Sequence, residues 1–164
     1  LNGSHLGPEL WDTIFEAGLP FNISVGCPNL IERIEGGLFS YGNEMTRENN
    51  PFEIGHGKFC VTDGSIDYIG RAALQKIVAE GVTREIRGVV FDGNPCPTCA
   101  KPWPVLVGDL QIGQITSGIW SPRLKKNIGQ SMIDRDFWEP GQGIKVALPD
   151  GSIRQGNVAA LPIS

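Results

Sequence analysis

Several features are scarce in this 164-residue sequence, and each scarcity excludes a class of protein. No uncharged apolar run comes near the ~18 residues that a membrane-spanning helix needs. Basic residues are not in excess either, because 14 Lys and Arg face 18 Asp and Glu, for a net charge of −4. Domains that bind the phosphate backbone usually carry a basic stripe. We therefore expect a soluble protein that binds neither membranes nor nucleic acid.

Cysteine is scarce as well, and four cysteines are too few for a secreted domain that is held together by disulfide bonds. Two of them form a C-x-x-C pair, Cys96 and Cys99. A zinc site needs a second pair at ligand spacing, and a thioredoxin-like pair stands at the start of a helix. The flanks of this pair are rich in Gly and Pro and predict a loop. Free thiols in a surface loop are the favoured interpretation, with metal binding and redox chemistry as the alternatives. Reduced thiols indicate a cytoplasmic location and no metal site.

The residues that are abundant favour short elements and many turns. The chain contains 22 glycines and 12 prolines, which is unlike a helical bundle. Hydrophobic residues make up 40% and charged residues 20%, so the chain can bury a core. The length fits one ordinary domain or two small ones.

Helical patterns are confined to the first half of the chain. They cover residues 8–16, a segment that opens at Asn29 and ends at the Gly36-Gly37 pair, and residues 70–80. Asn29 and Glu32 have the spacing of a capping box. Residues 43–58 predict an ordered loop.

The pattern changes near residue 84 to short apolar runs separated by turn residues. The runs are 87–91, 105–107, 112–115, 132–133, 144–148 and 153–158. Asp150-Gly151 and Gly108-Asp109 stand between such runs, and Asp-Gly is a strong hairpin signal. The sequence therefore predicts a mixed helical part followed by a small all-β barrel or sandwich.

Four motifs, in one order along the chain, carry a resemblance to a known family. They are RIEGGLFSYGNE (33–44), NPFE (50–53), DYIGRAAL (67–74), and IGQITSGIWSP (112–122) with KNIG (126–129). Together they resemble the glycine cleavage T-protein (aminomethyltransferase) family. PNLIER (28–33), MIDR (132–135) and WEPG (138–141) are more similar to its dimethylsulfoniopropionate demethylase branch.

The resemblance implies an α+β fold: the end of a folate-binding α/β body followed by a C-terminal antiparallel β-barrel. Residues 1–84 then belong to the folate-binding body and residues 85–164 to the barrel domain. Family members are about twice this length, and they begin with a catalytic aspartate region and a Y-T-G-E segment that have no match here. We expect a C-terminal part of the enzyme, without catalytic residues and inactive alone.

The resemblance also implies the ligands and partners. Tetrahydrofolate is the expected cofactor, and it receives a one-carbon unit from a small-molecule methyl or aminomethyl donor. The expected protein partners are the N-terminal half of its own enzyme and a second copy in a homodimer. A non-catalytic folate-binding module is the alternative from a different class.

Four residues at motif positions are the candidates for folate binding: Arg33, Glu35, Tyr41 and Trp120. A guanidinium suits a carboxylate tail and an aromatic ring suits a pterin, whereas a carboxylate can accept from the pterin amino edge. Each has a structural alternative. Arg33 could instead pair with Glu35 or Glu53, and the aromatic rings could belong to the core or to an interdomain contact.

Three further residues complete the expectations. T-proteins carry an arginine shortly before the position of Pro104, where this chain offers Lys101. His56 stands between two glycines and is expected to face solvent. Trp103, between two prolines, is expected to be exposed in a loop or an interface.

Overall fold

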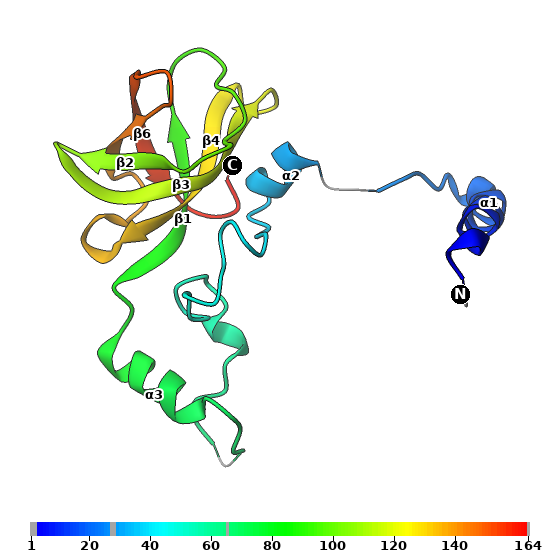
Figure 1. Cartoon of the computed structure of the whole chain (residues 1–164), viewed down its shortest axis with the longest axis horizontal. Coiled ribbons are helices and arrows are strands. Elements are labelled where there is room, and N and C mark those ends of the chain that lie inside the picture. Colours follow the sequence, from blue (N-terminus) through cyan, green and yellow to red (C-terminus); the bar gives the residue numbers. More distant parts are fainter. Residues whose placement is uncertain (1–2, 27–28, 65, 164) are drawn as a thin grey trace.

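The computed structural model describes residues 3–26, 29–64 and 66–163, and its centre is a closed barrel of antiparallel strands (Figure 1). The strands are β1 (Arg84–Phe91), β2 (Trp103–Val107), β3 (Leu110–Ser121), β4 (Lys126–Asp134), β5 (Gly143–Ala147) and β6 (Ile153–Ala159). Around the barrel they follow the order β1-β4-β3-β2-β5-β6, and β6 pairs with β1 to close the sheet. A barrel, rather than a sandwich, is therefore the architecture of the all-β part.

The barrel interior is filled by alternate residues of the strands, because successive side chains of a strand point to opposite faces. Its core cluster includes Val89, Val105 and Ile115, all with no exposed surface. Trp103 belongs to the same cluster and packs edge-on against Phe91, with ring centroids 6.2 Å apart. The expectation that Trp103 is exposed is therefore wrong, since its position on β2 turns the ring inward.

Two glycines of the T-S-G and N-I-G motifs serve this packing rather than a turn. A Cβ on Gly118 would lie 2.8 Å from the Trp103 ring, and one on Gly129 would lie 2.8 Å from Ile115. These strands also extend beyond the predicted runs, so that the segment around Thr116 is strand and not loop. A register shift between Ile115 and Ser117 marks a bulge there.

The helices precede the barrel: α1 (Gly7–Gly18), α2 (Leu30–Glu35) and α3 (Arg71–Glu80), with short 3-10 turns at Ser4–Leu6, Leu19–Phe21, Gly57–Phe59 and, after β4, Arg135–Phe137. The predicted capping box is confirmed: the Glu32 amide donates to Asn29 Oδ1 and the Asn29 amide to Glu32 Oε2, both at 3.0 Å. Of the helices, α2 lies beside the barrel, whereas α1 and α3 lie apart from it (Figure 1). No helix of the described ranges is long and apolar enough to cross a membrane.

Both apolar and polar contacts attach the first half of the chain to the barrel. Ile34 of α2 forms a fully buried cluster with Ile128 and Ile163. The Ile163 amide donates to the Glu35 carbonyl at 2.8 Å, and the Ile86 amide donates to the Glu53 carbonyl at 2.7 Å. The segment from α2 to Glu53 is thus held on the outer wall of the barrel.

Candidate functional site

Arg33 is the centre of a polar cluster where α2 meets the barrel. Its Nη1 donates to Glu44 Oε2 at 2.9 Å and to the Leu38 carbonyl at 3.1 Å. Its Nη2 donates to Ser117 Oγ at 2.7 Å, in strand β3. The ion pair that Arg33 makes is therefore with Glu44, not with Glu35 or Glu53.

Glu44 is a buried carboxylate whose charge is fully compensated. Its side chain has no exposed surface, against 17% for Arg33. It also accepts from the Ser40 amide at 2.8 Å and from Thr116 Oγ1 at 3.4 Å. A buried ion pair is stable only with such additional hydrogen bonds, so this arrangement fixes the Arg33 guanidinium in one orientation.

Arg33 also lines a cavity of about 350 Å³. Arg33 carries five N–H donors, and three of them bind Glu44, Leu38 and Ser117. The lining of the same cavity includes Lys101, Thr98 and Cys99. Two cationic side chains and a hydroxyl therefore border a space in which the described residues leave Arg33 with unused donors.

The C-x-x-C loop forms one wall of this cavity and is clamped to the barrel by Asn127. The Asn127 amide group donates to the carbonyls of Asp92, Gly93 and Asn94, and its Oδ1 accepts from the Cys96 amide at 2.8 Å. Both thiols are free, as predicted. Cys96 is buried, however, so the expectation of a surface position is wrong for that residue.

Burial changes the acidity of both thiols. It raises the pKa of the Cys96 thiol, and it raises the pKa of Cys99 to about 11, with a further contribution from the neighbouring Cys96 and Glu44. The Cys99 thiol donates to the Lys101 carbonyl at 3.1 Å. Neither thiol is activated as a nucleophile at neutral pH, and the described residues hold no group of three His, Cys, Asp or Glu side chains suited to a metal ion.

Glu35 makes a second polar contact between α2 and β3, outside the Arg33 cavity. It accepts from Ser121 Oγ at 2.5 Å and from Arg123 Nε at 2.7 Å. Burial alone would raise the pKa of the Glu35 carboxyl, but the hydrogen bonds from Ser121 and Arg123 outweigh it and hold the pKa below the ordinary 4.5. The residue is therefore ionised and positioned inward, toward the barrel.

The two aromatic candidates do not join Arg33 in its cavity. The Tyr41 side chain is 69% exposed. Trp120 is half-buried in β3, opposite Asn127 of β4. The structure thus brings Arg33 and Glu35 to one helix–barrel contact, whereas neither Tyr41 nor Trp120 lines the Arg33 cavity.

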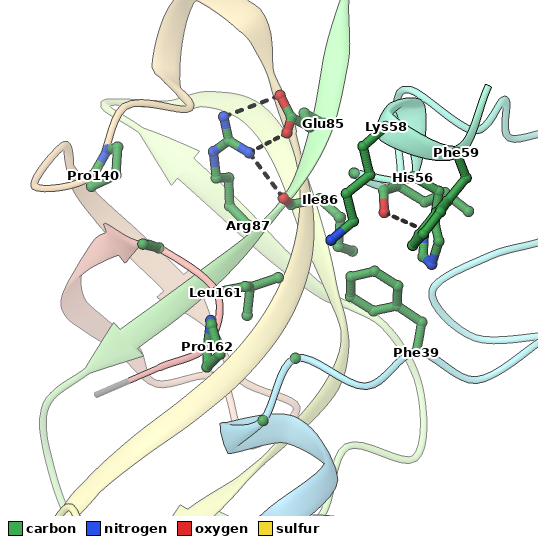
Figure 2. A pocket seen from close by; sticks show the side chains of 15 residues that line it. Phe39, His56, Lys58, Phe59, Glu85, Ile86, Arg87, Pro140, Leu161 and Pro162 are labelled. Atoms are coloured by element: carbon green, nitrogen blue, oxygen red, sulfur yellow. Dashed lines mark hydrogen bonds and ion pairs between the residues drawn. The ribbon is translucent and has the colours of Figure 1, made fainter. Parts of the chain in front are cut away.

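A larger cavity, of about 610 Å³, lies between strand β1, the loop that follows α2 and the C-terminal segment (Figure 2). His56 lines it, between the rings of Phe39 and Phe59. The expectation that His56 faces solvent is wrong, because the 54–59 turn folds its ring inward and the imidazole is half-buried. None of the four candidate residues lines this cavity.

Sequence reasoning missed the partners that hold the candidates in place. Glu44 stands 11 residues from Arg33, and Arg123 stands 88 residues from Glu35. Glu44 is the acidic position that ends the Y-G-x-(D/E) part of the first motif, which was the available signal. Nothing local marks Ser117 or Arg123 as partners, because the barrel fold alone brings them to α2.

Comparison with known proteins agrees with this geometry. Residues 84–163 match the model of the glycine cleavage T-protein C-terminal barrel domain. The chain is 47% identical over 160 residues to dimethylsulfoniopropionate demethylase DmdA from Ruegeria pomeroyi, covering 95% of this chain and 43% of that protein. It is 35% identical over 143 residues to an aminomethyltransferase from Thermoanaerobacter pseudethanolicus, covering 85% and 38% of the two chains.

A solved structure shares the fold. The aminomethyltransferase T of the glycine cleavage system from Bartonella henselae superposes with a TM-score of 0.66 at 18% identity, over 79% of this chain and 36% of that one. The chain spans less than half the length of these relatives.

The closed six-stranded barrel defines the class of the protein as one that carries the C-terminal barrel domain of glycine cleavage T-proteins. The chain belongs to the glycine cleavage T-protein (aminomethyltransferase) family. Its identity with the demethylase, 47%, exceeds the 35% with the aminomethyltransferase named above, as the branch-specific motifs predict.

Proposed function

We propose that this chain is the C-terminal part of a tetrahydrofolate-dependent transferase that demethylates a sulfonium donor such as dimethylsulfoniopropionate. The observation that carries the donor class is the 47% identity with a dimethylsulfoniopropionate demethylase, maintained over 95% of the chain. The rest of the enzyme supplies the reacting groups, so the chain alone is inactive.

The chemistry of the Arg33 cavity supports the cofactor. Tetrahydrofolate supplies N5 as the acceptor of the one-carbon unit and ends in a glutamyl carboxylate. A guanidinium with unused donors, in a cavity that Lys101 also lines, suits such a carboxylate. The Glu44 and Ser117 contacts hold the guanidinium in place before the ligand arrives, which lowers the entropic cost of binding. In this proposal Arg33 binds the tail and Lys101 takes the position of the family's arginine.

The three other candidates have smaller roles in the proposal. Glu35 orients α2 through Arg123, and it thereby positions Arg33 two residues earlier. Tyr41 is exposed, so it contacts the cofactor only if the rest of the enzyme covers it. In this proposal Trp120 contacts the cofactor from the barrel, where it lies opposite Asn127 of β4.

A sulfonium donor also explains why the described residues need no acid at this site. The leaving group is a neutral sulfide, which needs no proton to depart. Catalysis then depends on orientation and exclusion of water. Whatever the donor, this chain contributes binding and positioning.

The donor is tested with the full-length enzyme and tetrahydrofolate, with dimethylsulfoniopropionate compared against an aminomethyl-lipoyl carrier. We expect demethylation of the sulfonium compound and no transfer from the carrier. Transfer from the carrier alone would make the protein an aminomethyltransferase, which the 35% identity to those enzymes keeps as the second candidate. Tetrahydrofolate binding without either transfer would indicate a non-catalytic folate module.

The role of Arg33 is tested by Arg33→Gln in the same enzyme, with Arg47→Gln as the matched control. Arg33 borders the cavity, whereas Arg47 is exposed and does not line it, so the control measures the loss of one positive charge alone. Loss of one charged hydrogen bond to a carboxylate weakens folate binding roughly tenfold. Equal folate affinity in wild type and Arg33→Gln, by calorimetry, removes Arg33 from the site.

A further inference from the structure

The larger cavity has no part in the proposed function, and its lining is chemically specific. Its volume of about 610 Å³ lies within the range of small-molecule sites. One wall is the barrel, with Ile86 of β1 and Leu161 of the C-terminal segment, and the opposite wall is the loop that carries Phe39, His56 and Phe59 (Figure 2).

The loop wall presents three neighbouring rings, those of Phe39, His56 and Phe59. The His56 ring lies edge-on to Phe39 and tilted to Phe59, with both centroid distances at 5.8 Å. The imidazole is held by a hydrogen bond between Nδ1 and the Ile54 carbonyl at 2.8 Å. Among the described residues Nε2 has no hydrogen-bond partner, so it can bind a ligand. An aromatic ring would pack against this wall in an offset or edge-on arrangement.

The cavity also holds one uncompensated cation. Arg87 is neutralised by Glu85 at 2.6 Å and donates to the Trp138 carbonyl at 3.0 Å. Lys58, in contrast, has no ion pair with any residue in the described ranges, and its ammonium lies over the Phe59 ring, 5.1 Å from the centroid. Lys58 extends toward the barrel wall in Figure 2. With His56 counted as neutral, the lining therefore carries a net charge of +1.

We propose that this cavity is a binding site for an aromatic carboxylate, separate from the Arg33 cavity. The ring packs between the Phe39, His56 and Phe59 wall and the apolar barrel wall, and the carboxylate binds Lys58. The two cavities are separate sites because no residue lines both of them. The inference stands whether or not the protein acts on a sulfonium donor.

The test is an NMR titration of the chain with benzoate, followed through the backbone amides of residues 54–59 and 85–87. We expect saturable shifts with a dissociation constant of about 1 mM, as suits a ligand of this size. Benzyl alcohol keeps the ring but not the charge, and cyclohexanecarboxylate keeps the charge but not the flat ring. Each should bind roughly fivefold more weakly than benzoate.

The variants assign the two parts of the ligand. Lys58→Gln should weaken benzoate roughly fivefold and leave benzyl alcohol unchanged. Phe59→Leu should weaken both ring ligands by a similar factor. Lys76→Gln is the matched control, because Lys76 is an exposed lysine of α3 outside the cavity.

Three outcomes would overturn the proposal. One is the absence of saturable shifts at residues 54–59 up to about 20 mM benzoate. Another is equal weakening by Lys58→Gln and Lys76→Gln, which indicates nonspecific charge attraction. The third is displacement of benzoate by saturating tetrahydrofolate, which would merge this cavity with the cofactor site. Loss of folate binding in Arg33→Gln leaves the proposal intact, so the proposed folate site and the proposed aromatic carboxylate site are tested independently.

Discussion

The two halves of this chain use their apolar residues in opposite ways. The barrel, from Arg84 onward, buries a continuous cluster that runs from Val89 to Val158. In the preceding segment, α1 exposes 52% of Trp11 and 48% of Ile14, and the stretch before α3 leaves Ile69 fully exposed. In that segment Ile34 is the one fully buried apolar side chain among the described residues, and its partners are in the barrel. The barrel therefore has a core of its own, whereas in the first segment α2 depends on its contacts with the barrel and with Ile163.

Polar contacts differ between the halves as well. Buried carboxylates of the first segment, Glu35, Glu44 and Glu53, each accept hydrogen bonds and face an arginine. Two of these pairs, Glu35–Arg123 and Glu53–Arg84, join the segment to the barrel. Ion pairs of this kind fix orientation more than they add stability. The barrel thus provides the stability of the chain, and the first segment provides charged side chains held in fixed positions.

The largest effect is expected from a matched pair of tryptophan substitutions, which tests whether the stability resides in the barrel. Trp103→Ala removes a ring that is 1% exposed at the barrel centre, and we expect a loss of about 3–5 kcal/mol. Trp11→Ala removes a ring of α1 that is 52% exposed, and we expect a change within about 0.5 kcal/mol. Urea denaturation followed by circular dichroism measures both. Similar losses would mean that α1 belongs to the same cooperative unit as the barrel.

A second test removes the clamp on the C-x-x-C loop. Asn127→Ala deletes a fully buried amide side chain that bonds three loop carbonyls and the buried Cys96 amide. We expect a loss of about 2–3 kcal/mol, because several backbone groups lose their partner. Alkylation of Cys96 by iodoacetamide should also accelerate as the loop opens. An unchanged alkylation rate would show that another contact holds the loop.

A third test concerns pH and the contact between α2 and the barrel. The lowered pKa of Glu35 means that its contribution to stability is present above pH 4.5 and is lost as the pH falls through the folded-state pKa. Glu35→Gln should cost about 1–2 kcal/mol at pH 7. Its free energy of unfolding should also fall less than that of the wild type between pH 5 and pH 3. Parallel pH curves would mean that Glu35 does not titrate differently in the two states.

The smallest effect is expected at the cysteine pair. With a pKa of about 11, Cys99 should react slowly with iodoacetamide at pH 7.5, and its rate should still be rising above pH 10. Mass spectrometry of the alkylated peptide over this pH range measures the rate. A rate that is half-maximal at about pH 8.5, as in an unperturbed thiol, would show that the loop does not bury it.

Local signals predicted the parts of the fold that depend on local interactions. The capping box of Asn29 and Glu32 and the Asp150-Gly151 hairpin were both found, because each is decided by residues a few positions apart. The length of β3 was not predicted, since Thr116, Ser117 and Gly118 resemble a turn. Gly118 is required by a ring 15 positions earlier in the chain, and no local pattern contains that information.

The same distinction applies to the site. Arg33 and Glu35 were chosen from their motif, and both lie where α2 meets the barrel. Their partners Glu44, Ser117 and Arg123 follow from the folded topology. The aromatic cavity around His56 was missed entirely, because its two walls come from residues 39–59 and from the strand and C-terminal segment beyond residue 84.

The attachment of α2 to the end of the chain has a consequence for the order of assembly. At six residues α2 is too short to persist as an isolated helix. Its last carbonyls are bound by the Gln130 amide group and by the Ile163 amide, and Ile34 packs on Ile163. During synthesis the helix therefore leaves the ribosome long before its stabilising partners do. It can reach its final stability only when Ile163 has emerged, so Arg33 takes its final place only after all six barrel strands have been synthesised.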